Sequence, residues 1–141
     1  MSYTFYLEIE SGISKDELVS KVSSLTGSEA KDDILIYDNI WMRIYQPDDV
    51  NDSDFSYGVK PDICLLMRAQ PVKENDMKYI LSIVNRLLED NSWNAILMDE
   101  QPMPVFVYKD KIFTWNKKWY EDLVNIIQCH MRKSINKIGE I

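Results

Sequence analysis

The 141-residue sequence has few of the residues from which catalytic and metal sites are usually built. It contains one histidine, His130, and two cysteines, Cys64 and Cys129. A zinc site needs three or four nitrogen or sulfur ligands, so these three residues make a metal centre unexpected. Cys129 and His130 are neighbours, but adjacent residues on a helix do not face each other, which disfavours a nucleophile–base pair.

Glycine is scarce as well, and the four glycines are all more than ten residues apart: Gly12, Gly27, Gly58 and Gly139. A phosphate-binding loop places several glycines within a few residues, so that backbone N–H groups can approach the phosphates. No such loop exists in the sequence. We therefore expect no nucleotide-binding motif, no catalytic residues and no cofactor.

Long apolar runs are missing too. No stretch approaches the ~18 apolar residues of a membrane-spanning helix, and the N-terminus, MSYTFYLEIE, lacks the basic start of a signal peptide. The two cysteines lie in apolar stretches without a CxxC motif, which is typical of a reduced compartment. The sequence therefore predicts a cytoplasmic protein that does not enter a membrane.

The net charge of −7 is unevenly distributed along the chain. Residues 1–59 carry 4 basic and 12 acidic side chains, whereas residues 60–141 carry 12 basic and 11 acidic ones. The acidic half would repel a phosphate backbone, so direct binding of nucleic acid is not expected. It would attract a basic protein, although excess acid also serves solubility alone.

A polar stretch at residues 46–60 concentrates this acidic charge in four aspartates: Asp48, Asp49, Asp52 and Asp54. It is a poor calcium loop, because Asp54 stands where the sharp turn needs glycine and Lys60 where a glutamate should close the site. The stretch is either a solvated loop or an acidic loop that binds a partner. In the second case, Tyr45 and Tyr57 beside it are candidate aromatic anchors.

The apolar periodicity predicts an α+β fold. Residues 3–10 alternate as a half-buried strand, and Ser14 and Glu17 form a capping box before a helix that should end at Gly27. The further elements expected are a hairpin of 34–37 and 40–45, a strand 63–68, a helix 75–90, a strand 95–98, a hairpin of 105–108 and 112–115, and a helix 117–136. We expect a single domain, residues 1–141, with a mixed, mainly antiparallel sheet of about six to seven strands and three helices packed on it.

Several aromatic residues on these strands alternate with the expected core positions: Tyr6, Trp41, Tyr45, Tyr108 and Trp115. If the helices cover one face of the sheet, these side chains lie on the other face. A large exposed aromatic patch would mark a binding or dimer surface. The third helix could equally cover them.

The order of these segments resembles the bacterial Sit-type immunity protein family. The residues that carry the resemblance are Tyr3-x-Phe5-x-Leu7 with Ile13–Leu18, then Gly58–Arg68, the helix Met77–Leu88, the strand Trp93–Met98, and the hairpin Val105–Tyr108 with Ile112–Trp115. The similarity covers roughly residues 1–116, and residues 99–102 depart from it. It implies a cytoplasmic protein that binds and neutralises a cognate toxin, and it carries over no catalytic residues.

The partner-binding residues expected on this basis are Asp48, Asp49, Asp52 and Asp54, with Tyr45 and Tyr57. The partner is a cognate protein toxin, and a basic toxin fits the acidic half best; the chain itself is expected to be a monomer or a homodimer. Two other readings stay open. One is a homo-oligomeric regulatory or structural protein that pairs through the aromatic face. The other is a carboxylate-based enzyme that brings Asp99 or Glu100 close to another acid.

Overall fold

The computed structural model describes residues 2–46, 57–130 and 137–139. Along the chain the elements are β1 (Tyr3–Glu10), α1 (Lys15–Thr26), β2 (Ile34–Tyr37), β3 (Ile40–Tyr45), β4 (Ile63–Ala69), α2 (Asp76–Glu89), β5 (Asn94–Met98), β6 (Pro104–Lys109), β7 (Ile112–Asn116), α3 (Lys117–His130) and β8 (Lys137–Gly139). Residues 47–56, which include the four predicted aspartates, and residues 131–136 of the predicted last helix lie outside the described residues.

The described strands form one eight-stranded sheet in the order β2-β3-β4-β1-β5-β6-β7-β8. Neighbouring strands are antiparallel except β7 and β8, which are parallel. The predicted mixed, mainly antiparallel α+β sheet is confirmed, with one more strand than expected. The additional strand, β8, has only three residues, too few to show an alternating apolar pattern.

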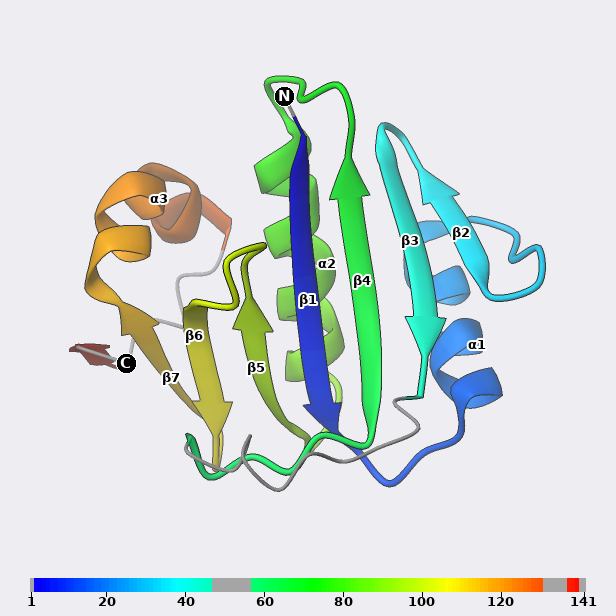
Figure 1. The fold of residues 1–141 in the computed structure, drawn as a ribbon, viewed down its shortest axis with the longest axis horizontal. Coiled ribbons are helices and arrows are strands. Elements are labelled where there is room, and N and C mark those ends of the chain that lie inside the picture. The colour runs from blue at the N-terminus through cyan, green and yellow to red at the C-terminus, as the bar shows by residue number, and fades with distance from the viewer. Residues whose placement is uncertain (1, 47–56, 131–136, 140–141) are drawn as a thin grey trace.

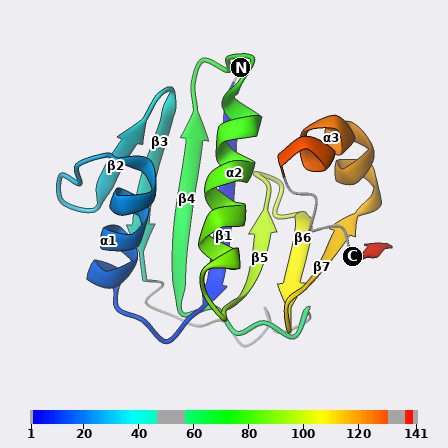
Figure 2. The same cartoon turned by 180° about the vertical axis from the view of Figure 1, so that it is seen from behind.

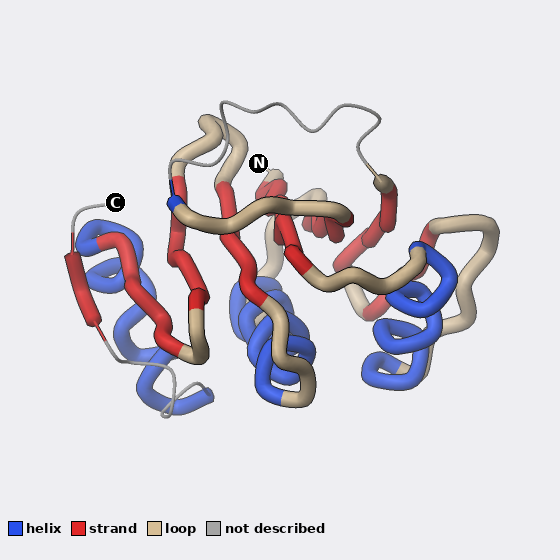
Figure 3. Tube along the Cα trace, turned by 90° about the horizontal axis from the view of Figure 1, so that it is seen from below, coloured by secondary structure: helices blue, strands red, loops and turns tan. Residues whose placement is uncertain are grey.

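All three helices lie on one face of the sheet. Figure 2 shows α1, α2 and α3 in front of the strands, and Figure 1 shows the opposite face without helices. In Figure 3 the helices lie on one side of the strand layer. The described part of the chain therefore forms two layers, and within it no helix covers the second face of the sheet.

Local signals set the ends of α1 as predicted. The Ser14 hydroxyl accepts the Glu17 N–H at 3.2 Å, and Gly27 ends the helix with a φ of 72°, a left-handed conformation that favours glycine. Leu18 and Val22 on one side of the helix are buried. The helix thus presents an apolar stripe to the sheet, where it packs near β3.

The predicted hairpin of β2 and β3 is confirmed to the residue. Asp38 adopts a φ of 53° in the two-residue turn, and its carboxylate accepts the Asn39 N–H at 2.8 Å. Aspartate tolerates this left-handed conformation because its short side chain can bond the local backbone. The turn fixes the register that pairs Tyr37 with Ile40.

The outer edge of β2 is partly occupied by its own chain. Lys31 and Ile34 exchange two backbone hydrogen bonds of 2.9 and 3.1 Å, and the Ser28 hydroxyl donates to the Ile36 carbonyl at 2.8 Å. The Ile36 side chain on this strand is 63% exposed. Three outward backbone groups of an edge strand are therefore already satisfied.

Two of the five aromatic residues assigned to the uncovered face lie elsewhere, so the expectation was wrong for Tyr108 and Trp115. Both belong to the buried core on the helix side. Phe106 pairs with Trp115 across β6 and β7, and their rings lie 5.0 Å apart. Tyr108 stands opposite Ala95 on β5, which is also a core residue, and this pairing cannot be seen in the alternation of a single strand.

Candidate functional site

The side chains of the uncovered sheet face follow from strand alternation. Phe5, Leu7 and Ile9 of β1 are buried in the helix-side core, so Tyr6 and Glu8 point to the other face. The same alternation in β3 and β4 brings further residues to this face: Trp41, Arg43, Tyr45, Cys64, Leu66 and Arg68. The prediction for Tyr6, Trp41 and Tyr45 therefore holds, and each is half-buried.

The strand register arranges these residues in rows across the sheet. One row runs from Tyr45 through Cys64 and Glu8 to Ile96. The next row runs from Arg43 through Leu66 and Tyr6 to Met98. Residues from β3, β4, β1 and β5, which are far apart in the sequence, thus become neighbours.

A segment before β4 covers one part of this face. Val59 is fully buried against Ile96 and Val107, and Tyr57 and Met98 pack on the same small cluster. The Lys60 N–H donates to the Glu10 carboxylate at 2.9 Å, which fastens the segment to the end of β1. Val59 was not predicted as a core residue, because it stands alone in a polar stretch.

A cavity of about 310 Å³ opens on the uncovered face beside this segment. Its lining comes from β1, β3, β5 and the β5–β6 turn: Tyr6, Glu8, Tyr45, Met98, Asp99, Glu100 and Pro102. Two phenol rings and a methionine supply apolar surface, and three carboxylates supply negative charge. Among the described residues, no lysine or arginine lines the cavity. The cavity therefore has the chemistry to receive a cation with an apolar stem.

Tyr45 and Cys64 are linked at the base of this region. Burial is the largest cause that raises the pKa of the Cys64 thiol to about 12; a hydrogen bond from the Tyr45 hydroxyl lowers it, and the negative charge of Glu8 raises it. Burial also raises the pKa of Tyr45 well above its usual range, and the bond to Cys64 adds to this. At neutral pH both groups hold their protons, and the thiolate form that a nucleophilic Cys64 would need is disfavoured.

Asp99 has a defined structural role in the β5–β6 turn. One carboxylate oxygen accepts the N–H groups of Gln101 and Met103, each at 2.9 Å. The other oxygen lies 3.3 Å from the indole nitrogen of Trp119 at the start of α3. These bonds close the turn and link it to the start of α3, and the exposed Glu100 next to Asp99 lines the cavity.

The predicted partner-binding residues divide into three groups. Tyr45 lines the cavity, whereas Tyr57 packs on its own chain near Val59. Asp48, Asp49, Asp52 and Asp54 lie outside the described residues, and their role stays a prediction. Tyr6 was expected on the same sheet face as Tyr45 but was not named among the partner-binding residues. Glu8 and Met98 were not predicted for the site at all, because their closeness to Tyr45 depends on strand order.

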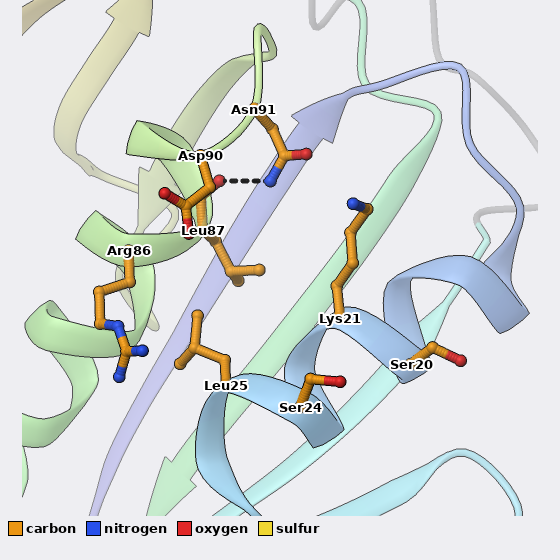
Figure 4. A pocket seen from close by; sticks show the side chains of 8 residues that line it. All are labelled: Ser20, Lys21, Ser24, Leu25, Arg86, Leu87, Asp90 and Asn91. Atoms are coloured by element: carbon orange, nitrogen blue, oxygen red, sulfur yellow. Dashed lines mark hydrogen bonds between the residues drawn. The ribbon is translucent and has the colours of Figure 1, made fainter.

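A second hollow lies on the helix side, between α1 and α2, with a volume of about 380 Å³. Figure 4 shows Leu25 and Leu87 pointing toward one another, with Lys21 and Arg86 on the two sides. The Lys21 amino group lies 5.9 Å from the centre of the Trp93 ring, so it is already engaged within the protein. Asp90 offsets part of the positive charge of Lys21 and Arg86 in this hollow.

Metal sites and membrane-spanning helices find little support in the part of the chain that the structure describes. No group of three or more histidine, cysteine, aspartate or glutamate side chains in this part could hold a metal ion. Within residues 2–46, 57–130 and 137–139, no helix has both the length and the apolar character to span a membrane. Comparisons with protein-family models, with curated proteins and with solved structures found no match.

Proposed function

We propose that this chain is an immunity protein that binds a cognate bacterial toxin through its uncovered sheet face and neutralises it by covering a surface that the toxin needs. The observation that carries the proposal is the cavity where Tyr6, Tyr45 and Glu8 meet the turn at Asp99 and Glu100. Aromatic anchors in hollows are the usual centres of protein interfaces. The family resemblance of residues 1–116 supports the same reading.

The charge distribution favours a basic partner. The half of the sequence that supplies β1 and β3 also carries 12 acidic against 4 basic side chains. Such an imbalance attracts a basic protein over distances of about a Debye length and raises the association rate. The acidic loop with Asp48, Asp49, Asp52 and Asp54 follows Tyr45 directly in the sequence, so we propose that it extends the binding surface.

The size of the uncovered face sets a requirement on the interface. Four strands ~4.8 Å apart and ~20 Å long, β2, β3, β4 and β1, give a face on the order of 400 Å². A specific interface buries roughly 800 Å² of each partner. The face therefore supplies about half of the area, and residues 46–60 are the adjoining part of the chain expected to contribute the remainder.

A co-expression experiment tests the proposal. Each candidate toxin encoded beside this gene is expressed with and without the protein, and survival and co-purification are scored. Rescue together with a stable complex is the expected result. A variant with Tyr6→Ala and Tyr45→Ala should lose rescue, whereas the matched control Tyr79→Ala on α2, which lies on the helix side, should keep it if it folds.

The alternative functions predict different outcomes. A homo-oligomer that pairs through the same face would show a dimer by light scattering at high concentration, and Tyr6→Ala would dissociate it. A carboxylate-based enzyme is favoured by one observation, since Glu8, Asp99 and Glu100 share one cavity. In that case Glu8→Gln would abolish an activity while leaving the complex with a toxin unaffected.

A further inference from the structure

We propose that the cavity lined by Tyr6, Glu8, Tyr45, Met98 and Glu100 receives a single arginine side chain presented by the protein partner. The inference deepens the proposed function and rests on it for the nature of the partner. It specifies the chemical group that enters the cavity.

The charge of the cavity selects a cation. Glu8 and Glu100 contribute carboxylates to its lining, and Asp99 adds a third that is held in place by its bonds to Gln101 and Met103. The field of Glu8 reaches into the sheet, where it contributes to the raised pKa of both Tyr45 and Cys64.

The shape and surface of the cavity favour arginine over other cations. Its volume of about 310 Å³ is at the lower end of ligand pockets, which suits one long side chain rather than a helix or a bulky ligand. Phenol rings of Tyr6 and Tyr45 offer faces on which a planar guanidinium can stack. Met98 can pack on the aliphatic stem, and a carboxylate can accept two parallel N–H bonds.

The cations of the same face lie outside the cavity. Arg68 on β4 is exposed and pairs with Thr4, one row beyond the row of Tyr6. Arg43 is also exposed and shares the row of Tyr6 and Met98, but it stands on β3, two strands away from Tyr6. Lys109 at the end of β6 lies against Gly58. None of these three side chains is among the described residues that line the cavity, whose charged groups are all acidic, so the cavity is the position on this face that complements an arginine.

An NMR titration without any toxin tests the inference. The labelled protein is titrated with N-acetyl-arginine amide and, in parallel, with N-acetyl-citrulline amide, which has nearly the same shape but no charge. We expect saturable shifts centred on Tyr6, Glu8, Tyr45 and Met98, with a dissociation constant below ~10 mM for the arginine compound. The citrulline compound should bind roughly tenfold more weakly or not at all.

Variants separate the cavity from general acidity. The double substitution Glu8→Gln with Glu100→Gln should weaken the arginine compound by roughly tenfold, since each lost ion pair costs about threefold. The matched control, Glu29→Gln with Glu121→Gln, removes two exposed acids away from the cavity and should leave the affinity unchanged. Equal weakening in both double variants would overturn the inference.

Other results would overturn it as well. Equal affinities of the arginine and citrulline compounds would exclude recognition by charge, and equal affinity of N-acetyl-lysine amide would exclude a site selective for guanidinium. The toxin proposal is tested separately, by the co-expression experiment. Binding of the arginine compound without rescue from any neighbouring toxin would support the arginine site and reject the toxin proposal. Rescue without binding of the arginine compound would support the toxin proposal and reject the arginine site.

Discussion

The side-chain amide of Asn39, at the tip of the β2–β3 hairpin, donates a hydrogen bond of 2.9 Å to the carboxylate of Asp76, the first residue of α2. The same amide donates to the Pro71 carbonyl at 2.6 Å, and the Lys73 N–H donates to the Asp76 carboxylate at 2.6 Å. Asp76 is 1% exposed. One contact therefore joins the hairpin, the loop after β4 and the start of α2.

Substitution of Asn39 by alanine should lower the free energy of unfolding by about 1.5–3 kcal/mol, because a buried carboxylate loses a donor. Chemical denaturation of the wild type, Asn39→Ala, Asp76→Ala and the double variant measures this. The two effects should overlap by at least ~1 kcal/mol in the double-mutant cycle. Simple additivity would mean that the bond contributes nothing of its own.

Val59→Ala should destabilise the protein by roughly 1–3 kcal/mol, because Val59 is fully buried on Ile96 and Val107 and the substitution leaves a void. Val72→Ala removes the same two methyl groups at a half-buried position and should cost less. Denaturation curves in urea give both values. If the two variants are equally stable, the segment before β4 is not clamped to the sheet as described.

Alkaline pH should destabilise the fold through Cys64. Its thiol has a pKa of about 12 in place of 9.0, so between these values the unfolded chain has lost a proton that the native protein keeps. The free energy of unfolding therefore falls as pH rises through this window, by up to ~1.4 kcal/mol per pH unit. Below the ordinary thiol pKa the thiol is protonated in both the native and the unfolded state, so it no longer makes the free energy of unfolding depend on pH.

Stability curves of Cys64→Ala and Cys129→Ala between neutral pH and the upper end of this window check the prediction. The slope should become shallower in Cys64→Ala and stay close to that of the wild type in Cys129→Ala, whose exposed side chain serves as the control. Burial also raises the pKa of Tyr45, so Tyr45 contributes to the pH dependence of stability that remains in Cys64→Ala.

Alanine substitution of Asp48, Asp49, Asp52 and Asp54 should slow association with a basic toxin by ~10-fold or more at low salt and flatten its salt dependence. Stopped-flow binding at several salt concentrations measures both quantities. Four exposed acids distributed elsewhere serve as the control for net charge: Glu29, Glu74, Glu121 and Asp122. Equal effects of the two sets would show that total charge, rather than this loop, steers the partner.

Those parts of the fold that depend on short-range signals could be predicted from the sequence. The turn at Asp38 and the helix stop at Gly27 each need a left-handed backbone conformation, which few residue types adopt easily. Both were located to the residue. The positions of Trp115 and Tyr108 depend instead on which residues they pair with across the sheet, since Tyr108 stands opposite Ala95 and Trp115 opposite Phe106.

The candidate site could be predicted only in part for the same reason. Tyr45 was identified by its place beside an acidic stretch, but its neighbours in the cavity come from β1, β5 and the turn after β5. Nothing in the alternation of Tyr6 or Met98 says that β1 lies between β4 and β5. Long-range strand order brings them together, and a single sequence carries almost no signal for it.

The bonds from Ser28 and Lys31 to β2 have a consequence for how the protein behaves when it is concentrated in a cell. An edge strand with an exposed isoleucine would normally be a template on which another copy could add a strand and begin a fibril. Here the Ile34 and Ile36 backbone is already bonded on that side, and the opposite edge strand, β8, has only three residues. The described sheet therefore resists the addition of strands at both edges, and the protein should stay free of fibrils at high concentration.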